Sequence, residues 1–546
     1  MVSNKTAALQ LQLHISGCYG RKTEADGLIL YGAVFIGERS VTAQQLAVLI
    51  SDALDTNKLN DVLASLNGFF ALVYQHNDTV LCVTDKVRSR PLFYALFDQQ
   101  LIVADQAVVI LQQYVRSAEQ PSANIDNTSQ IEFMHTGFVT GKQTLHANIM
   151  QLQAAELLQV NLHTAKIHRQ FYYCFIPHNN SELNADIVNW QGKLDSLIKK
   201  VVQRLITYAN GRQIVVPLSG GYDSRALALY LKQAGYTNVL CFTFGRPGSA
   251  EVALSYRVAT ELGFPWHCVT YSRRMWRQLL QQPQFNDYLR FVHGLVSVPN
   301  VQVFPAVQQL VARQLINPDA VIAPGHTSAF FSGDMDNSLA GNGNWPKQAL
   351  QAVIARHYQN SRQPLPDAVL NKVQQQIAEI VAVAKRQGIT NSNSVAEAWN
   401  YRERQAKFII NSNRYYDFFA LDWWMPFWDS EFMAFWQQVP FNLRQNKTLW
   451  TGFVEQQMAS FTGSTKPYGH AHKKKYSWLT RYYSWFNYFL DDNDLFALVP
   501  FSRWFLFKLR VSKRSGTVFG CLAEYSLHKD KILFANKTKN DFLPEK

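Results

Sequence analysis

The chain has 546 residues, of which 47% are hydrophobic and 17% are charged, and its formal net charge is +13. This length exceeds what one hydrophobic core supports, so we expect two to four domains, and the composition excludes a disordered chain. The positive charge is compatible with a nucleic acid, a membrane surface or an anionic substrate as partner.

The sequence predicts neither a membrane span nor a disulfide framework. No uninterrupted run of 18 apolar residues occurs, and the first residues contain no apolar signal core. The six cysteines are scattered without paired spacing, which also argues against a zinc site. We therefore expect a cytoplasmic protein.

The first third of the chain alternates short apolar runs with turns. Residues 27–37, 68–74 and 80–85 have the length and composition of β-strands. The polar residues 76–78 separate the last two runs and predict a hairpin between them. We expect this part of the chain to be rich in β-structure.

Three phrases in this first third resemble landmarks of a known domain family. Residues 66–72, 85–94 and 137–149 are similar to the scaffold of class II glutamine amidotransferase domains. The resemblance implies an α+β, sandwich-like domain over residues 1–170. A linker and a first helix would follow over residues 171–195.

The catalytic signature of that family is missing from the sequence. The resembled enzymes hydrolyse glutamine with an N-terminal cysteine, whereas position 2 is Val2. Cys18 is a lone cysteine, and we expect it to be structural. We predict a degenerate domain that makes no ammonia and packs against the rest of the chain.

Residues 214–231 carry the strongest signal of chemistry in the chain. A branched apolar run meets Ser219-Gly220-Gly221 and then an apolar run with helical character. Such a strand, turn and helix N-terminus cradle phosphate, because glycines expose backbone N–H groups and the helix dipole favours negative charge. Asp223 adds a carboxylate that suits magnesium.

Strands and helices alternate around this loop. Residues 187–206 have helical spacing, residues 239–245 and 266–271 are strand-like, and a helix is expected between them over residues 250–262. Residues 320–324 form a fourth apolar run. The alternation predicts an α/β domain with a doubly wound parallel sheet, a ligand at the carboxyl ends of its strands, and a helical C-terminal part.

The motif Ser-Gly-Gly-x-Asp-Ser resembles the pyrophosphate loop of N-type ATP pyrophosphatases. Together with the first domain, residues 25–460 resemble the asparagine synthetase family, whose synthetase domain would span residues 196–460. The resemblance implies ATP and Mg²⁺ as cofactors, adenylation of a carboxylate, and attack by ammonia or an amine. It assigns ATP and pyrophosphate binding to Leu218, Ser219, Gly220, Gly221, Asp223, Ser224, Phe242, Phe244, Gly325 and Ser328.

The resemblance also implies catalytic residues. His326 occupies the position of a base, and an imidazole with an ordinary pKa near ~6.5 suits a proton acceptor. Asp422 would orient that histidine, and Lys447 would stabilise negative charge. A hydrogen-bonding role in its loop is the alternative for His326.

The expected magnesium site is one charged ligand short. The family has an aspartate where this chain has Ala329, so Asp223 would need help from Asp334 or Asp336 further along the loop. Without such help the enzyme would be weakened or inactive.

Residues 461–546 form a basic, aromatic extension that the resemblance does not cover. This segment has 15 Lys and Arg against 7 Asp and Glu. An aromatic packing face with solvated lysines explains such a composition, and a membrane surface is the second explanation. Nucleic acid is the partner that we expect least.

The resemblance therefore implies a carbon–nitrogen ligase that forms an amide. A sugar uronate of bacterial surface polysaccharide is one acceptor that the resemblance suggests, with ammonia supplied by a separate glutaminase. Two alternatives remain: a pseudoenzyme that binds nucleotide or acts as a scaffold, and a membrane-peripheral or nucleic-acid-binding protein that works through its basic tail.

Overall fold

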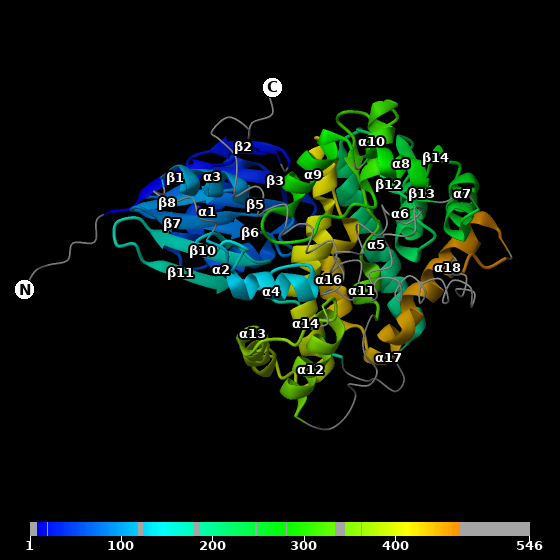
Figure 1. The fold of residues 1–546 in the computed structure, drawn as a ribbon. Helices are drawn as coiled ribbons and strands as arrows, with labels where there is room; N and C mark the ends of the chain where they lie inside the picture. Colours follow the sequence, from blue (N-terminus) through cyan, green and yellow to red (C-terminus); the bar gives the residue numbers. More distant parts are fainter. Residues whose placement is uncertain are drawn as a thin grey trace, which may run out of the picture.

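The computed structural model describes residues 8–469 except 19, 118–123, 180–185, 246–247, 280, 334–343, 362 and 465. Its N-terminal part contains two β-sheets (Figure 1). The first has the order β1 (Gln10–His14), β8 (Gln100–Ala104), β7 (Phe93–Phe97) and β9 (Met150–Gln151). The second has the order β11 (Ile167–Phe171), β10 (Glu156–Asn161), β6 (Thr79–Thr84), β5 (Asn67–His76), β3 (Leu28–Ile36) and β2 (Lys22–Ala25), with β4 (Arg39–Val41) paired to β3.

These two sheets share one apolar core. Val73 and Leu158 of the second sheet lie in the same buried cluster as Leu101 and Val103 of the first. Helices α1 (Ala43–Asp55) and α2 (Leu59–Ser65) cover the second sheet, and α3 (Ala107–Ser117) and α4 (Asn127–Thr136) cover the first. The predicted hairpin is confirmed, because β5 and β6 pair antiparallel around residues 76–79.

The C-terminal part is built on one parallel sheet. Its strands lie in the order β14 (Trp266–Thr270), β13 (Val239–Gly245), β12 (Ile214–Pro217), β15 (Val321–Ile322) and β16 (Asp422–Trp423). The helices α5 (Ile187–Ala209), α6 (Tyr222–Gln233) and α7 (Ala250–Leu262) connect or precede these strands. Strands covered on both faces need apolar side chains throughout, which is why the sequence showed unbroken apolar runs.

Helices make up most of the remaining chain. These are α8 (Arg273–Leu279), α9 (Pro283–His293), α10 (Phe304–Ala312), α11 (Ser328–Phe331), α12 (Trp345–His357), α13 (Asp367–Arg386), α14 (Ser392–Asn400), the π-helix η2 (Tyr401–Ile410), η3 (Asn411–Asn413), α15 (Arg414–Phe418), η4 (Pro426–Trp428), α16 (Ser430–Gln438), α17 (Phe441–Arg444), η5 (Gln445–Lys447) and α18 (Thr448–Thr462). The predicted strands and helices around the loop are confirmed, and the fourth strand is shorter than expected. The domain boundaries remain predictions.

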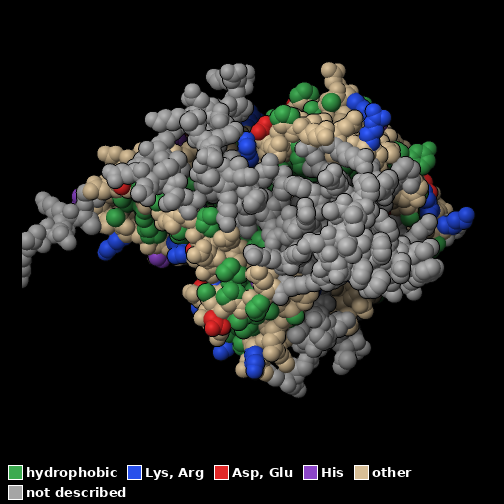
Figure 2. Space-filling model, viewed as in Figure 1, with side chains coloured by type: hydrophobic (Ala, Val, Ile, Leu, Met, Phe, Trp, Pro, Cys, Tyr) green, Lys and Arg blue, Asp and Glu red, His purple; other side chains and the backbone are tan. Residues whose placement is uncertain are grey.

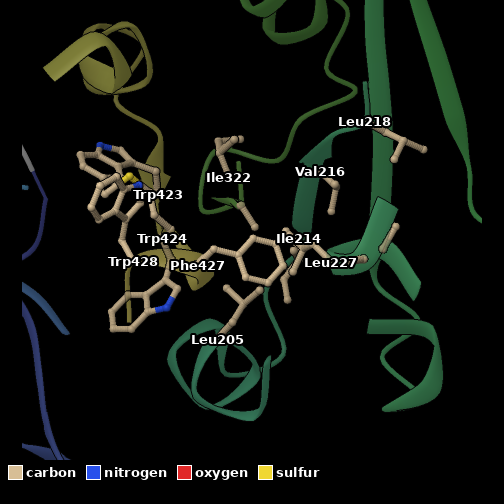
Figure 3. Close-up of a cluster of buried hydrophobic side chains, with 14 of the residues drawn as sticks. Leu205, Ile214, Val216, Leu218, Leu227, Ile322, Trp423, Trp424, Phe427 and Trp428 are labelled. Carbon is tan, nitrogen blue, oxygen red and sulfur yellow. The ribbon is translucent and has the colours of Figure 1, made fainter. Parts of the chain in front are cut away.

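A large core holds the parallel sheet against its helices. Figure 3 shows Phe427 of η4 pointing toward Ile214 of β12 and Leu205 of α5. The same cluster reaches the N-terminal part, where Phe35 and Phe69 contact the ring of Trp424 edge-on, with ring centroids 5.6 Å and 4.5 Å apart. The two parts of the molecule therefore share buried aromatic contacts.

The basic, aromatic extension predicted over residues 461–546 lies mostly outside the described residues, which end at Gly469. On the face shown in Figure 2, lysine and arginine side chains lie at several separate places on the described surface. Within the described part of the chain, no helix is both long and apolar enough to cross a membrane.

Candidate functional site

The glycine-rich loop lies where β12 ends and α6 begins. Gly221 is the extended residue before the first turn of α6, and its N–H donates to Ser219 Oγ at 3.1 Å. Ser219 N–H in turn donates to Ser224 Oγ at 3.0 Å. The two serines thus brace the loop internally, and the start of the helix faces the carboxyl end of the sheet.

A second loop closes over this helix terminus. A Cβ atom on Gly325 would lie 2.5 Å from both the N and the Cα of Ser224, so only glycine permits the approach. The chain after β15 therefore packs directly on the first turn of α6. Gly325 has a steric role in addition to the binding role that the sequence suggested.

The two loops enclose a cavity of about 340 Å³ at the carboxyl ends of the strands. Its lining residues are Pro217, Leu218, Ser219, Gly221, Tyr222, Asp223, Ser224, Phe242, Thr243, Phe244, Glu251, Val303, Pro324, Gly325, His326, Ala329, Tyr415, Tyr416, Lys447, Trp450 and Thr451. Most of the residues predicted to bind ATP therefore surround one space. Gly220 and Ser328 are not among its lining residues.

Asp223 is the one acidic side chain held inside this cavity by direct contacts that the structure describes. Its Oδ1 accepts from the indole N–H of Trp450 at 2.8 Å, and its Oδ2 accepts from the backbone N–H of Ala329 at 3.2 Å. Burial raises the pKa of Asp223 to about 6, although these hydrogen bonds and the charge of Lys447 act in the opposite direction.

His326 lies on the wall of the same cavity. Burial lowers its pKa to about 4, and a hydrogen bond with the Asn413 side chain opposes that shift. Its Nε2 atom is buried and has no hydrogen-bond partner among the described residues. The imidazole is thus neutral at pH 7, and its Nε2 is unpaired among the described residues.

The predicted pairing of Asp422 with His326 is wrong. Asp422 Oδ2 accepts from Tyr208 Oη at 2.6 Å and from Arg212 Nη1 at 3.0 Å. The register explains the error, because Asp422 pairs with Val321 at the start of β15, whereas the cavity lies beyond the carboxyl end of that strand. Asp422 therefore belongs to an ion-pair network at the other end of the sheet.

At the place predicted for magnesium, the described residues supply one carboxylate, that of Asp223. Each of its oxygens accepts one N–H group, which leaves a lone pair on each for an ion that also binds phosphate oxygens. No group of three or more His, Cys, Asp or Glu side chains in the described residues could hold a metal ion. Asp334 and Asp336 lie outside the described residues.

The residues of β13 that were predicted to contact adenine lie beside the glycine-rich loop. Phe242 and Phe244 line the cavity, and Leu218 N–H donates to the Phe242 carbonyl at 2.8 Å. Phe244 stacks on Tyr271, with ring centroids 5.0 Å apart. The assignment of these residues to a nucleotide base remains a prediction.

Sequence reasoning gave no role to several residues of the cavity wall, among them two tyrosines and two residues of α18. Tyr415 and Tyr416 come from α15, which directly follows the π-helix η2 and η3. Trp450 and Thr451 lie in the first turn of α18. The available signal was the position of Trp450 three residues after Lys447, which places both at the start of α18.

Cys18 lies in the N-terminal part, far along the chain from this cavity. Gln106 Nε2 donates to its sulfur at 3.1 Å, and the sulfur lies 3.8 Å from Asp105 Oδ2. Burial and then the Asp105 carboxylate raise the pKa of the Cys18 thiol well above its ordinary value. The thiol is protonated at neutral pH and is not an activated nucleophile. Val2 lies outside the described residues.

Comparison with known proteins points to the same N-terminal part. Residues 48–173 match the family described as a glutamine amidotransferase domain. No curated protein matches the chain. An NH3-dependent NAD synthetase from Campylobacter jejuni, in complex with nitrate, is similar at 14% identity over 40% of this chain and 93% of that one, with a TM-score of 0.22.

A second solved structure is similar to part of the chain. The glutamine phosphoribosylpyrophosphate amidotransferase from B. subtilis, complexed with ADP and GMP, is similar at 10% identity, with a TM-score of 0.19. The match covers 56% of this chain and 63% of that one, which is less than two thirds of the amidotransferase. The family match of residues 48–173 is the finding on which the assignment of this part depends.

Proposed function

We propose that the protein is an ATP-dependent synthetase of the asparagine synthetase type that forms an amide. A carboxylate oxygen of the substrate attacks the α-phosphate of ATP, and pyrophosphate leaves. Ammonia or an amine then attacks the acyl carbon and loses a proton to a base. The bond between the acyl carbon and the bridging oxygen breaks, and AMP leaves with that oxygen. The observation that carries the proposal is a single cavity that combines the Ser219–Ser224 loop with His326 and Lys447.

Each of these groups has a separate role in the proposed reaction. The loop and the N-terminus of α6 hold the departing pyrophosphate. Lys447 lines the cavity and stabilises the negative charge that develops on the phosphorus and acyl oxygens. His326 accepts a hydrogen bond from the attacking amine, and nearby phosphate charge raises the pKa of its imidazole toward a useful range. We assign no step to magnesium.

The nitrogen in this proposal comes from outside the chain. The Cys18 thiol is protonated, so it is not an activated nucleophile that could release ammonia from glutamine. Free ammonia, an amine, or ammonia from a separate glutaminase therefore supplies the nitrogen. The amidotransferase-like part contributes packing through the contacts of Phe35 and Phe69 with Trp424.

For the acceptor we propose a sugar uronate, which combines a carboxylate with a ring that can pack on aromatic faces. Tyr415, Tyr416 and Trp450 supply such faces on the cavity wall. Glu251 is exposed and Asp223 is already hydrogen-bonded, so the described lining offers little to pair with the ammonium group of a free amino acid.

The test is carboxylate-dependent exchange between ATP and labelled pyrophosphate, with uronic acids and amino acids as alternative acceptors. We expect exchange with uronates, amide formation when ammonium is added, and no activity with glutamine as the nitrogen source. If the folded protein binds ATP and no acceptor supports exchange, the synthetase proposal fails and a nucleotide-binding scaffold takes its place.

A further inference from the structure

Arg225 lies in the first turn of α6, directly behind the glycine-rich loop. Its side chain is fully buried, with 0% exposed. Its Nη2 donates to the carbonyl of Gly220 at 3.3 Å, and its guanidinium lies 4.6 Å from the centroid of the Tyr222 ring. A buried cation therefore contacts the backbone of the loop itself.

This contact holds the peptide between Gly220 and Gly221 from one side. The peptide is trans, so its C=O and its N–H point in opposite directions. Arg225 engages the carbonyl, and the N–H of Gly221 donates to Ser219 Oγ at 3.1 Å. Ser219 and Gly221 line the cavity, whereas Gly220 does not. The N–H therefore lies on the cavity side of the loop, and the carbonyl lies on the far side.

A Gly-Gly pair needs such a support. Glycine reaches both signs of φ at little cost, so a rotation of this peptide plane meets little steric resistance. A phosphate oxygen that accepts from Gly221 N–H takes the place of Ser219 Oγ. The contact of Arg225 with the carbonyl then keeps the N–H directed at the phosphate.

Arg225 is itself held by residues 466–469, which we call the strap. Its Nη1 donates to Glu455 Oε1 at 2.9 Å, and its Nη2 donates to the Gly469 carbonyl at 2.9 Å. Glu455, on α18, also accepts from the backbone N–H groups of Tyr468 at 2.9 Å and Gly469 at 2.8 Å. The centroid of the Tyr468 ring lies 5.3 Å from the guanidinium. The strap, α18 and the phosphate loop thus meet at one guanidinium.

A second arginine holds the strap from another side. Arg257 of α7 donates through Nη2 to Ser464 Oγ at 2.9 Å and to the Lys466 carbonyl at 3.2 Å. Its guanidinium lies 4.2 Å from the centroid of the Tyr468 ring. Within the described part of the chain, none of its hydrogen bonds reaches residues 219–225. Arg257 therefore separates the role of the strap from the role of the loop contact.

We propose that Arg225 is a positioning residue that holds the Gly220–Gly221 peptide plane for phosphate, and that the strap and Glu455 keep Arg225 in place. Binding of pyrophosphate and docking of the strap are then coupled, so each strengthens the other. This inference rests on the proposed function, because it takes the pyrophosphate part of ATP as the ligand of the loop.

The first experiment is a double-mutant cycle in the affinity of the full chain for inorganic pyrophosphate, measured by calorimetry in magnesium chloride. Arg225→Lys keeps a buried cation beside Glu455 but loses the fork that bridges loop and strap, so it should bind about tenfold more weakly. Glu455→Gln keeps the size of the side chain and removes its charge, and should lose about threefold. The double variant should match Arg225→Lys within about twofold, because both substitutions act through one contact.

The matched control is Arg257→Lys. It makes the same substitution in an arginine that holds the same strap but does not contact the loop. It should bind pyrophosphate within about twofold of the wild type, since Arg225 and Glu455 still meet the strap. Thermal unfolding of each variant establishes that the protein is folded.

Hydrogen exchange tests the coupling in the wild type, so it decides the question even if Arg225→Lys does not fold. The amides of Tyr468 and Gly469 donate to Glu455, and their exchange is followed by mass spectrometry of a peptide that covers the strap. Saturating pyrophosphate should slow this exchange at least about threefold. A peptide around the turn at residues 98–99, between β7 and β8, should not respond.

Three results would overturn the inference and leave the proposed synthetase standing. These are additive losses in the cycle, a loss in Arg257→Lys equal to that in Arg225→Lys, and strap exchange that pyrophosphate leaves unchanged. Folded wild type that binds neither pyrophosphate nor ATP removes the inference and the proposed function together.

Discussion

At the scale of the residue, burial changes the chemistry expected of His326. The ordinary pKa of an imidazole made this residue a candidate base, and burial lowers that pKa to about 4. We expect His326→Asn to reduce amide formation by about 100-fold, a typical contribution of a proton acceptor, and to leave ATP–pyrophosphate exchange within a few-fold of the wild type. Equal loss of both activities would show that His326 serves nucleotide binding.

His357 offers a second prediction at this scale, which concerns stability. Its ring stacks on Trp399, and burial, followed by the charges of Arg404 and Arg356, lowers its pKa to about 3. Below pH 6.5 this histidine binds a proton in the unfolded chain but stays neutral in the folded chain. It therefore lowers the free energy of unfolding as the pH falls toward 3.

The pH dependence of stability should therefore weaken in His357→Gln. Relative to this variant, the wild type should lose about 2–3 kcal/mol of unfolding free energy between pH 7 and pH 4.5. Denaturant unfolding at several pH values measures the difference. His163→Gln, which alters an exposed histidine, is the control and should follow the wild type. A pH-independent gap between wild type and His357→Gln would contradict the prediction.

At the scale of the element, the site depends on the contact of the β15–α11 loop with α6. Gly325→Ala would place a Cβ atom 2.5 Å from the backbone of Ser224. We expect a loss of about 1–3 kcal/mol in stability from the overpacking, and a loss of ATP affinity of at least about tenfold, because the first turn of α6 must move. Calorimetric titration with ATP and thermal unfolding measure both effects.

Gly192→Ala is the matched control for this variant. Gly192 lies inside α5, and a Cβ atom there would meet nothing within 4 Å. The substitution should leave ATP affinity unchanged and should raise stability by about 0.5–1 kcal/mol, since alanine loses less backbone entropy in a helix. Equal effects of the two variants would show that the loop contact with α6 is unimportant.

At the scale of the whole molecule, a buried ion pair of the C-terminal part is hydrogen-bonded to the N-terminal part. Asp429 Oδ2 accepts from Arg204 Nη1 at 2.7 Å and from Asn67 Nδ2 at 3.0 Å, and Asn67 belongs to β5 of the N-terminal part. Both charged side chains are 2% exposed. Removing Asp429 therefore leaves the buried charge of Arg204 with the half-exposed Glu431 as its carboxylate partner.

We expect Asp429→Ala to lose about 3–5 kcal/mol of stability and to separate the unfolding of the two parts, whereas the wild type should unfold in one calorimetric transition. Asp287→Ala removes an exposed ion pair with Arg290 and should cost less than about 1 kcal/mol. Two separate transitions in the wild type would show that the interface does not couple the parts.

The local pattern of the sequence by itself determined much of the molecule. The apolar runs, the turn at residues 76–78 and the glycine-rich loop at Ser219–Ser224 predicted strands, a hairpin and a strand–turn–helix that the structure contains. These features depend on neighbours within a few residues, so composition and periodicity are sufficient to reveal them.

Only the tertiary structure decided which side chains meet. Because Asp422 of β16 pairs with Val321 of β15, Asp422 does not contact His326. Because α18 packs against the loop, Trp450 contacts Asp223, which is 227 residues away in the sequence. Burial lowered the pKa of His326, and no local pattern reports burial. The physical reason is that contacts, register and desolvation arise from distant segments packing together, whereas a sequence pattern describes one segment at a time.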